Sequence, residues 1–280
     1  MRSLPAPDRK DGLGFRHVCR YYSDLAPRAR DVVKAYRDYI VSCAQGVVPI
    51  GLCKRDKELM ELAYSSKAKA AGLDWINRLH DGHDLNFCPL CGGPGCRTID
   101  HHLPDASYPE FSVFSRNLVP SCSSCNPKRN NSNQHGAALL TLSPYFDHAA
   151  LDCIRLYTEI QPPYSDPTFE YKVKLQPFNA ALSARINNHL ATCIDDAAFV
   201  TWTKGQWSDM YSQRASRHST VGSFVAELTD NLNAEVQLGN GNSWNASLVR
   251  GLLRNPEAAK WMIDNPVLLA ALSATELGLD

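Results

Sequence analysis

The sequence lacks any long hydrophobic run, because no apolar stretch reaches the roughly 18 residues that a membrane-spanning helix needs. The first ten residues include two prolines and four charged side chains, and they contain no apolar core of a secretory signal. The chain has no internal repeat and no low-complexity tract. These absences argue against membrane-spanning, secreted and repeat proteins, and we expect a soluble protein of the cytoplasm. In that compartment the ten cysteines are expected to be thiols and metal ligands rather than disulfides.

The chain also lacks net charge, with 29 Lys and Arg against 29 Asp and Glu, but its charges are unevenly distributed. Residues 1–80 hold 15 basic and 9 acidic side chains, whereas residues 136–280 hold 10 basic and 15 acidic ones. The basic first segment could follow a phosphate backbone or meet an acidic partner. Residues 85–135 hold 4 basic and 3 acidic side chains, so this middle segment is not expected to bind nucleic acid tightly alone.

Composition and pattern predict an α+β protein that is mostly α-helical and has three parts. Residues 1–80 are predicted to be a basic arm followed by a helical region. Residues 81–135 are rich in Gly, Pro, Cys, Asn and Ser, and have little periodicity. Residues 136–280 are predicted to be a mainly helical region that serves assembly or recognition.

The spacing of apolar residues predicts the elements within these parts. An arm is expected over residues 1–23, and short strands are expected at Arg97–His102 and Leu118–Pro120. Alternation predicts a further strand at Phe169–Leu175. The expected helices are Leu25–Ala44, Asp56–His80, Ala180–Leu190, Ala197–Ser216, Val221–Leu238 and Ser247–Ile263. The second could be broken in two by Gly72, and the last is split near Asn255 by Pro256.

Two Cys-x-x-Cys pairs, Cys88-Pro-Leu-Cys91 and Cys122-Ser-Ser-Cys125, are separated by 30 residues. Zinc prefers thiolate ligands, and each pair lets two thiolates converge from one tight turn, so the two pairs supply a closed tetrahedral site. The surrounding segment is too irregular to bury much of a core, and we expect a structural Zn²⁺ to staple it. Two alternatives stand beside this one: Cys96 replaces one of the ligands, or some of the four are buried core thiols.

An acid, two histidines and two asparagines lie between and just after the cysteine pairs. Histidine titrates near neutral pH and therefore suits a general base. A carboxylate and an Asn carbonyl oxygen suit a hard divalent ion such as Mg²⁺. This combination is typical of phosphodiester hydrolysis, which needs an activated water and a cation on the phosphate. The residues are Asp100, His101, His102, Asn117 and Asn126.

Taken together, these motifs resemble the HNH, or ββα-metal, endonuclease family, in the subgroup whose active site is flanked by two Cys-x-x-Cys pairs. The resemblance covers roughly residues 86–131, less than a fifth of the chain. It rests on Cys-x-x-Cys, Asp-His-x-x-Pro, Asn-Leu and Cys-x-x-Cys-Asn in that order. It implies a zinc-stapled ββα core that cuts nucleic acid, with DNA favoured, using Mg²⁺ or Mn²⁺.

The resemblance also implies a role for each matching residue. His101 would be the general base that deprotonates water, and Asp100 would be a first ligand of the catalytic divalent ion. Asn126 would be the second ligand of that ion. Asn117 would brace the loop and help to orient the base. Phosphate contacts would come from Lys128 or Arg129.

Some of these assignments leave alternatives open. The doubled histidine permits a second register, in which His101 becomes the metal ligand and His102 the base. Pro104 lies three residues after His101, which favours the first register. Because the third motif position is Asn rather than His, His135 could be an additional ligand. The Lys128–Arg129 pair could equally be a solvated surface.

The first functional hypothesis is therefore a metal-dependent endonuclease. Asp-His-His-Leu-Pro followed by Tyr-Pro-Glu-Phe and Asn-Leu-Val-Pro is similar to HNH proteins of bacterial antiviral defence, including the Septu and retron-associated proteins that pair with an ATPase. Such a partner would deliver nucleic acid to a near-neutral catalytic segment or license cutting. The alternative is a non-catalytic zinc-ribbon module that binds nucleic acid or protein. A hydrolase with a catalytic zinc is disfavoured, because four thiolates leave zinc no open position.

Overall fold

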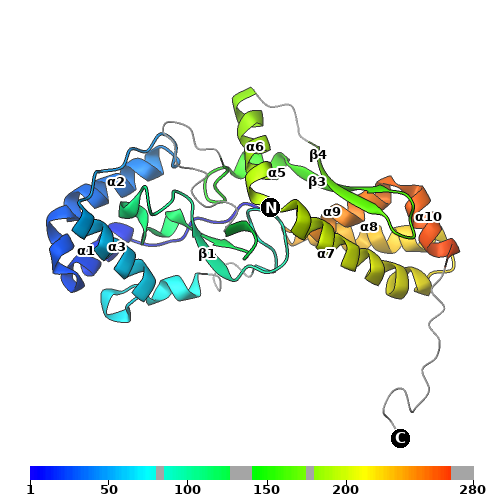
Figure 1. Ribbon diagram of the computed structural model, residues 1–280, viewed down its shortest axis with the longest axis horizontal. Helices are drawn as coiled ribbons and strands as arrows, with labels where there is room; N and C mark the ends of the chain where they lie inside the picture. The colour runs from blue at the N-terminus through cyan, green and yellow to red at the C-terminus, as the bar shows by residue number, and fades with distance from the viewer. Residues whose placement is uncertain (80–84, 127–140, 175–179, 266–280) are drawn as a thin grey trace, which may run out of the picture. The chain divides into compact units, whose positions relative to one another are not determined.

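The computed structural model describes residues 1–79, 85–126, 141–174 and 180–265 (Figure 1). These residues are mostly helical and contain two small antiparallel sheets of two strands each. This confirms the predicted α+β class with mainly helical content. The chain divides into two compact units, Met1–Ile154 with Leu175–Asp195 and Arg155–Lys174 with Asp196–Asp280. The predicted segments 1–80 and 81–135 both lie in the first unit.

The first unit opens with three helices, α1 (Asp11–Tyr21), α2 (Ala29–Val41) and α3 (Lys54–Ser66). The helix expected from Leu25 becomes regular later, because Ser23–Arg28, which includes Pro27, forms a 3-10 turn instead. The helix expected over Asp56–His80 ends at Ser66. The chain then turns through two short 3-10 segments, with Gly72 between them in a left-handed conformation (φ 70°).

The prediction of an arm over residues 1–23 is wrong, because α1 occupies half of it and is packed into the core. Phe15 and Val18 of α1 are buried in the same hydrophobic cluster as residues of α2. Glycine interrupts the apolar pattern that would have indicated this helix. At Gly12 a Cβ atom would lie 3.3 Å from Val33 Cγ1, so the missing side chain lets α1 approach α2 closely.

Two strands, β1 (Thr98–His101) and β2 (Leu118–Ser121), pair antiparallel close to the predicted positions. Their register sets Asp100 opposite Val119 and His101 opposite Leu118. The long connection between them contains two 3-10 turns, η4 (Pro109–Phe111) and η5 (Ser115–Asn117). The hairpin therefore presents the predicted catalytic pair at the end of β1, directly before this connection.

Aromatic side chains of α2 hold the connection in place. Tyr36 stacks on Phe114, with ring centroids 4.2 Å apart, and Tyr39 contacts Phe111 at 5.0 Å. All four rings are buried. Such contacts add specific geometry to the hydrophobic burial of the rings, so this cluster fixes the connection against α2. The unit is completed by α5 (His148–Cys153), which the apolar spacing did not predict, and α6 (Ala180–Cys193).

The second unit is a β-hairpin covered by helices. Strands β3 (Arg155–Gln161) and β4 (Thr168–Lys174) pair antiparallel, and α9 packs on β3 while α7 packs on β4 (Figure 1). The strand β4 confirms the predicted one, whereas β3 was not predicted. The helices are α7 (Asp196–Asp209), α8 (Val221–Gln237), α9 (Trp244–Arg254) and α10 (Pro256–Asp264).

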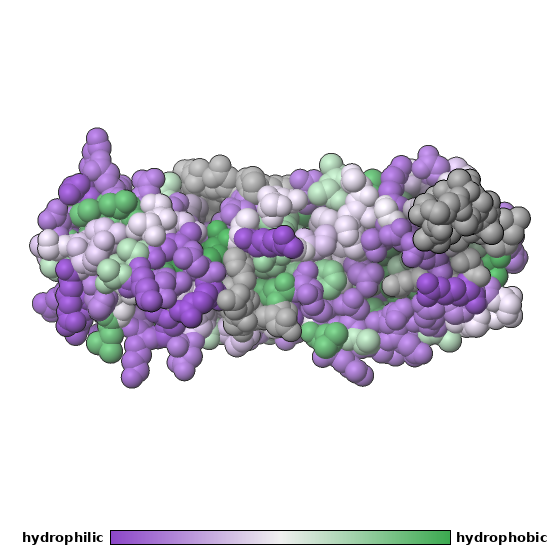
Figure 2. Space-filling view, turned by 90° about the horizontal axis from the view of Figure 1, so that it is seen from below, coloured by the Kyte–Doolittle hydropathy of each residue, from purple (hydrophilic) through white to green (hydrophobic). Residues whose placement is uncertain are grey.

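The predicted split of the last helix is confirmed. Pro256 begins α10, where its missing N–H costs nothing, and the side chain of Asn255 accepts a hydrogen bond from Ala258 N at 3.1 Å. Within the described ranges, every helix is too short or too polar to cross a membrane. The face seen in Figure 2 is covered mostly by hydrophilic side chains, with hydrophobic ones in small scattered groups.

Candidate functional site

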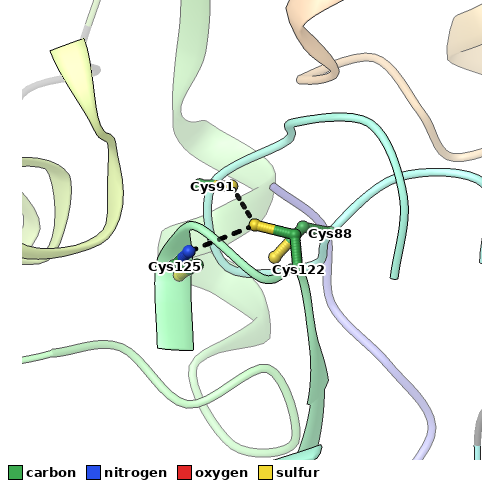
Figure 3. A group of neighbouring side chains, drawn as sticks. All are labelled: Cys88, Cys91, Cys122 and Cys125. Atoms are coloured by element: carbon green, nitrogen blue, oxygen red, sulfur yellow. Dashed lines mark hydrogen bonds between the residues drawn. The ribbon is translucent and has the colours of Figure 1, made fainter. Parts of the chain in front are cut away.

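Four cysteine side chains converge in the first unit, as the two Cys-x-x-Cys pairs predicted. Cys88 and Cys91 lie on a tight turn, whereas Cys122 follows β2 and Cys125 begins a helical turn. Their sulfur atoms lie within 4.8 Å of one another, and all four side chains are buried (Figure 3). The Sγ atoms of Cys91 and Cys122 are 3.6 Å apart. Thiolates around one tetrahedral zinc would be about 3.8 Å apart, so this group of four could hold a metal ion.

Backbone donors support the sulfurs. Gly93 N donates to Cys91 Sγ and Cys125 N donates to Cys122 Sγ, each at 3.3 Å. Hydrogen bonds from Cys125 and from the first pair lower the pKa of the Cys122 thiol. The two backbone N–H donors would also stabilise the negative charge of a metal-bound thiolate. Cys96 is buried but lies outside the group of four.

Helix α6 fastens the first cysteine turn, a role that sequence reasoning missed. His189 is fully buried, and its Nε2 donates to Leu90 O at 2.8 Å while its Nδ1 accepts from Leu142 N at 3.1 Å. Leu90 lies between Cys88 and Cys91, so this histidine holds the peptide that joins the two cysteines. No local pattern could have indicated the contact, because His189 follows Leu90 by 99 residues.

His101 ends β1 and has a defined ring orientation. Its Nε2 lies 3.0 Å from Ser112 O, and its Nδ1 lies 3.7 Å from Asp105 Oδ2. A carbonyl oxygen only accepts, so the ring proton belongs on Nε2, and Nδ1 keeps a lone pair that can take a proton. The ring of Tyr64 packs against that of His101, with centroids 4.4 Å apart.

Two acids near His101, Asp100 and Asp105, also lie close to Tyr64. Burial, and then the charges of Asp105 and Asp100, raise the pKa of Tyr64 to about 12. Asp100 is half-buried on β1, and Asn126 lies nearby, because its Nδ2 donates to Ile99 O at 3.4 Å. Asp100, His101 and Asn126 are thus brought to one region of the unit. Tyr64 and Asp105 are further members that sequence reasoning missed.

Asn117 and His102 lie in the interior. Asn117 is fully buried, and its side chain accepts from Leu103 N at 2.7 Å and donates to Leu103 O at 3.0 Å. Its backbone oxygen accepts from His102 N at 2.7 Å. His102 is also fully buried. Three predicted site residues, Lys128, Arg129 and His135, lie outside the described residues.

A cleft of about 280 Å³ opens beside His101. Asp105 and Ser112, which both face the His101 ring, line this cleft together with Lys57 and Glu61 of α3. His101 itself is not among the lining residues, and the cleft meets its ring through Asp105 and Ser112. Its walls carry charge of both signs.

Comparison with known proteins gives a short similarity. Over 40 residues the chain is 62% identical to Protein ea31 of Escherichia phage lambda. The matched segment makes up 14% of this chain and 14% of the phage protein. No family model matches the chain, and no solved structure matches it. The similarity therefore concerns a short segment of both proteins.

Proposed function

We propose that the protein is a metal-dependent endonuclease of the HNH type, which hydrolyses phosphodiester bonds of nucleic acid, with DNA favoured. The observation that carries the proposal is the orientation of His101. Its Nε2 is occupied by Ser112 O at 3.0 Å, which leaves Nδ1 as a proton acceptor on the side of Asp105, a residue that lines the cleft. Asp105, at 3.7 Å from Nδ1, would stabilise the imidazolium that forms.

Of the two motif registers that the doubled histidine permits, we propose the one in which His101 is the base. His102 is fully buried, so a phosphodiester could not reach its ring without opening of the core. The His101 side chain is 9% exposed and lies against residues that line the cleft. Asn117 would act as a positioning residue, because it holds the connection that follows the base.

We propose Asp100 and Asn126 as the ligands of a catalytic Mg²⁺ or Mn²⁺. Asn126 uses its Nδ2 toward Ile99 O, and among the described residues its Oδ1 has no hydrogen bond that would compete with a cation. One carboxylate and one amide oxygen are hard ligands, and they leave most coordination positions to water and phosphate oxygens. Among the described residues only the cysteine group brings three or more Cys, His or carboxylate ligands together, so the proposed second site would be completed by substrate.

The four cysteines are proposed to bind a structural Zn²⁺, which would hold β2 and the first cysteine turn together. A closed site of four thiolates leaves no position for water, so its contribution is to folding rather than to chemistry. Lys128 or Arg129, directly after this site in the sequence, is proposed to contact phosphate.

The proposed reaction is a one-step hydrolysis. His101 Nδ1 takes a proton from a water molecule, and the water oxygen attacks phosphorus in line with the bond to the leaving 3′ oxygen. That bond breaks as the new one forms, and the 3′ oxygen leaves with a proton from solvent. When bound, the divalent ion would neutralise the charge that develops on the phosphate.

A role in bacterial anti-phage defence with a partner subunit such as an ATPase is the finer proposal. The near-neutral charge of residues 85–135 supports it, because that segment offers little attraction to nucleic acid and would gain from a partner that delivers the substrate.

The test is cleavage of plasmid DNA with Mg²⁺ or Mn²⁺ by the wild type, His101→Ala and His17→Ala. His17 is a matched control, because its Nε2 also meets a backbone carbonyl, Ala70 O at 3.1 Å, but on α1. We expect His101→Ala to lose about 100-fold or more in rate with folding and metal content unchanged, and His17→Ala to cut normally. Equal cutting by His101→Ala would overturn the assigned base. A folded, metal-loaded wild type that does not cut would reject an autonomous nuclease in favour of a partner-dependent one or a zinc-ribbon binding module.

A further inference from the structure

A second hollow in the first unit has five basic side chains and one acidic side chain among its twelve lining residues. It has a volume of about 400 Å³ and lies between α1 and α2, with Phe114 and Arg116 of the β1–β2 connection also in its wall. No predicted site residue lines it. The basic side chains are Arg9, Lys10, Arg16, Arg37 and Arg116.

The acid in this wall does not neutralise the cations at the surface. Asp11 has a side chain only 8% exposed, and its carboxylate accepts from Ser115 Oγ at 2.7 Å and faces Arg116 at 3.7 Å. Its charge therefore balances that of Arg116, one of the five cations, rather than the charges of those at the surface. Lys10, Arg16 and Arg37 are exposed, and none has a carboxylate within 4.0 Å among the described residues. The hollow consequently has an excess of positive charge.

The form of the hollow suits phosphate groups. Guanidinium groups bind phosphate oxygens through paired hydrogen bonds, and several of them along a groove can follow successive phosphates. Arg9 is held in place by its contact with the Trp75 ring at 4.1 Å, so part of the wall is ordered before a ligand arrives. Leu13 and Ile40 are 59% and 38% exposed in the same wall, and apolar side chains there can contact sugars or bases.

The hollow is close in the fold to the proposed base. Arg116 precedes Leu118 by two residues, and Leu118 is the strand partner of His101. Paired Cα atoms lie about 5 Å apart and consecutive Cα atoms lie about 3.8 Å apart, so the Arg116 and His101 backbones are within roughly 13 Å. In a nucleic-acid strand whose scissile phosphate lies at His101, the neighbouring phosphates would lie at comparable distances from His101.

We propose that this hollow binds phosphates of a nucleic-acid strand away from the bond that is cut. The choice of nucleic acid over another polyanion rests on the proposed function of the His101 site. The binding itself is separable from cleavage and is measured separately.

The test uses the full chain carrying His101→Ala, so that no cutting occurs, and a fluorescent oligonucleotide in single- and double-stranded form. Arg16→Gln with Arg37→Gln removes two cations from the hollow. Arg20→Gln with Arg30→Gln is the matched control. Both arginines are exposed and lie on the same two helices, and their replacement removes the same amount of charge outside the hollow. Affinity is measured by fluorescence anisotropy over a series of salt concentrations.

We expect the hollow pair to weaken binding at least 10-fold and to reduce the slope of log affinity against log salt by up to about 2, with little change in the control pair. No binding by the parent protein at low salt, or equal loss in both pairs, would overturn the proposal. Hollow-dependent binding of a labelled poly-glutamate peptide without oligonucleotide binding would also overturn it, in favour of an acidic protein partner. Hollow-dependent binding by a protein whose wild type does not cut DNA would uphold the hollow and reject an autonomous nuclease.

Discussion

Asn117 binds both backbone polar groups of Leu103, accepting from its N–H at 2.7 Å and donating to its C=O at 3.0 Å. The same side chain also accepts from Tyr39 OH at 3.1 Å and donates to Phe111 O at 3.3 Å. One buried amide thereby joins the residue after the doubled histidine to α2 and to η4. The position of the proposed base depends on this amide even though Asn117 does not touch it.

Asn117→Ala is expected to lower the free energy of unfolding by about 3 kcal/mol or more, because it leaves several buried donors and acceptors unpaired. Urea denaturation measures this loss, and cleavage should fall as well. Asn126→Ala is the comparison, since Asn126 is half-buried and its side chain donates to one backbone oxygen, Ile99 O at 3.4 Å, among the described residues. It should keep the stability and lose the metal-dependent cleavage. The reverse pattern would contradict the assigned roles.

Cys122→Ser should lower metal content and stability together, because a hydroxyl is a poor replacement for a thiolate in a closed site. We expect bound zinc to fall well below one ion per chain, as measured by a colorimetric zinc assay, together with an earlier urea transition. Cys153→Ser changes a thiol outside the group of four and serves as the control. A Cys122→Ser protein that stays folded and zinc-loaded would show that the group does not bind zinc as proposed.

Glu110 gives a prediction for pH. It is fully buried, its Oε1 accepts from Ile50 N at 3.1 Å, and its Oε2 has no partner among the described residues. Burial raises the pKa of Glu110. An acid whose pKa is raised by folding favours the fold while protonated, and this contribution is lost as the pH rises from its ordinary pKa through the raised value.

Glu110→Gln removes this titration and keeps the shape and the acceptor for Ile50 N. We expect the variant to gain stability relative to the wild type at about pH 8, and the gain to shrink toward about pH 4. Urea denaturation at several pH values measures it, with exposed Glu58→Gln as the control. A gain in stability that does not depend on pH would contradict the prediction that Glu110 becomes ionised while buried.

Gly251 allows α9 to lie directly on β3. A Cβ atom at this position would be 2.2 Å from Thr158 O, a backbone atom that cannot move without shifting the strand. Gly251→Ala should therefore lower stability by about 1–3 kcal/mol. At Gly205 in α7 an added methyl group would meet nothing within 4 Å, and Gly205→Ala should instead gain up to about 1 kcal/mol. Thermal unfolding of both variants tests the contrast, and a harmless Gly251→Ala would mean that the two elements are further apart.

Local patterns predicted the parts of this fold that local chemistry controls. The cysteine spacing predicted the convergence of four sulfurs, and the alternation of Phe169–Leu175 predicted a strand. The end of a helix at Asn255 was predicted from the restraint that Pro256 places on the backbone of the preceding residue. In each case a few adjacent residues contain the physical cause.

The remaining features depend on residues far apart in the sequence. Tyr39 and Asn117 are 78 residues apart, and His189 follows Leu90 by 99 residues. Their hydrogen bonds form only after packing, so neither residue stands out in its own segment. The helix α1 was missed for a different reason, because Gly12 lowers its local helical signal while serving a close contact with α2.

The first unit is not continuous along the chain, because Arg155–Lys174 belongs to the second unit and the chain then returns for Leu175–Asp195. The return includes α6, whose His189 holds the peptide between the first two cysteines. During synthesis, the cysteine turn therefore leaves the ribosome about 100 residues before the helix that fastens it, at rates that allow roughly 5–20 s of delay. Over that interval an early-bound metal ion would restrain the segment in place of His189, so metal supply during translation would influence the yield of folded protein.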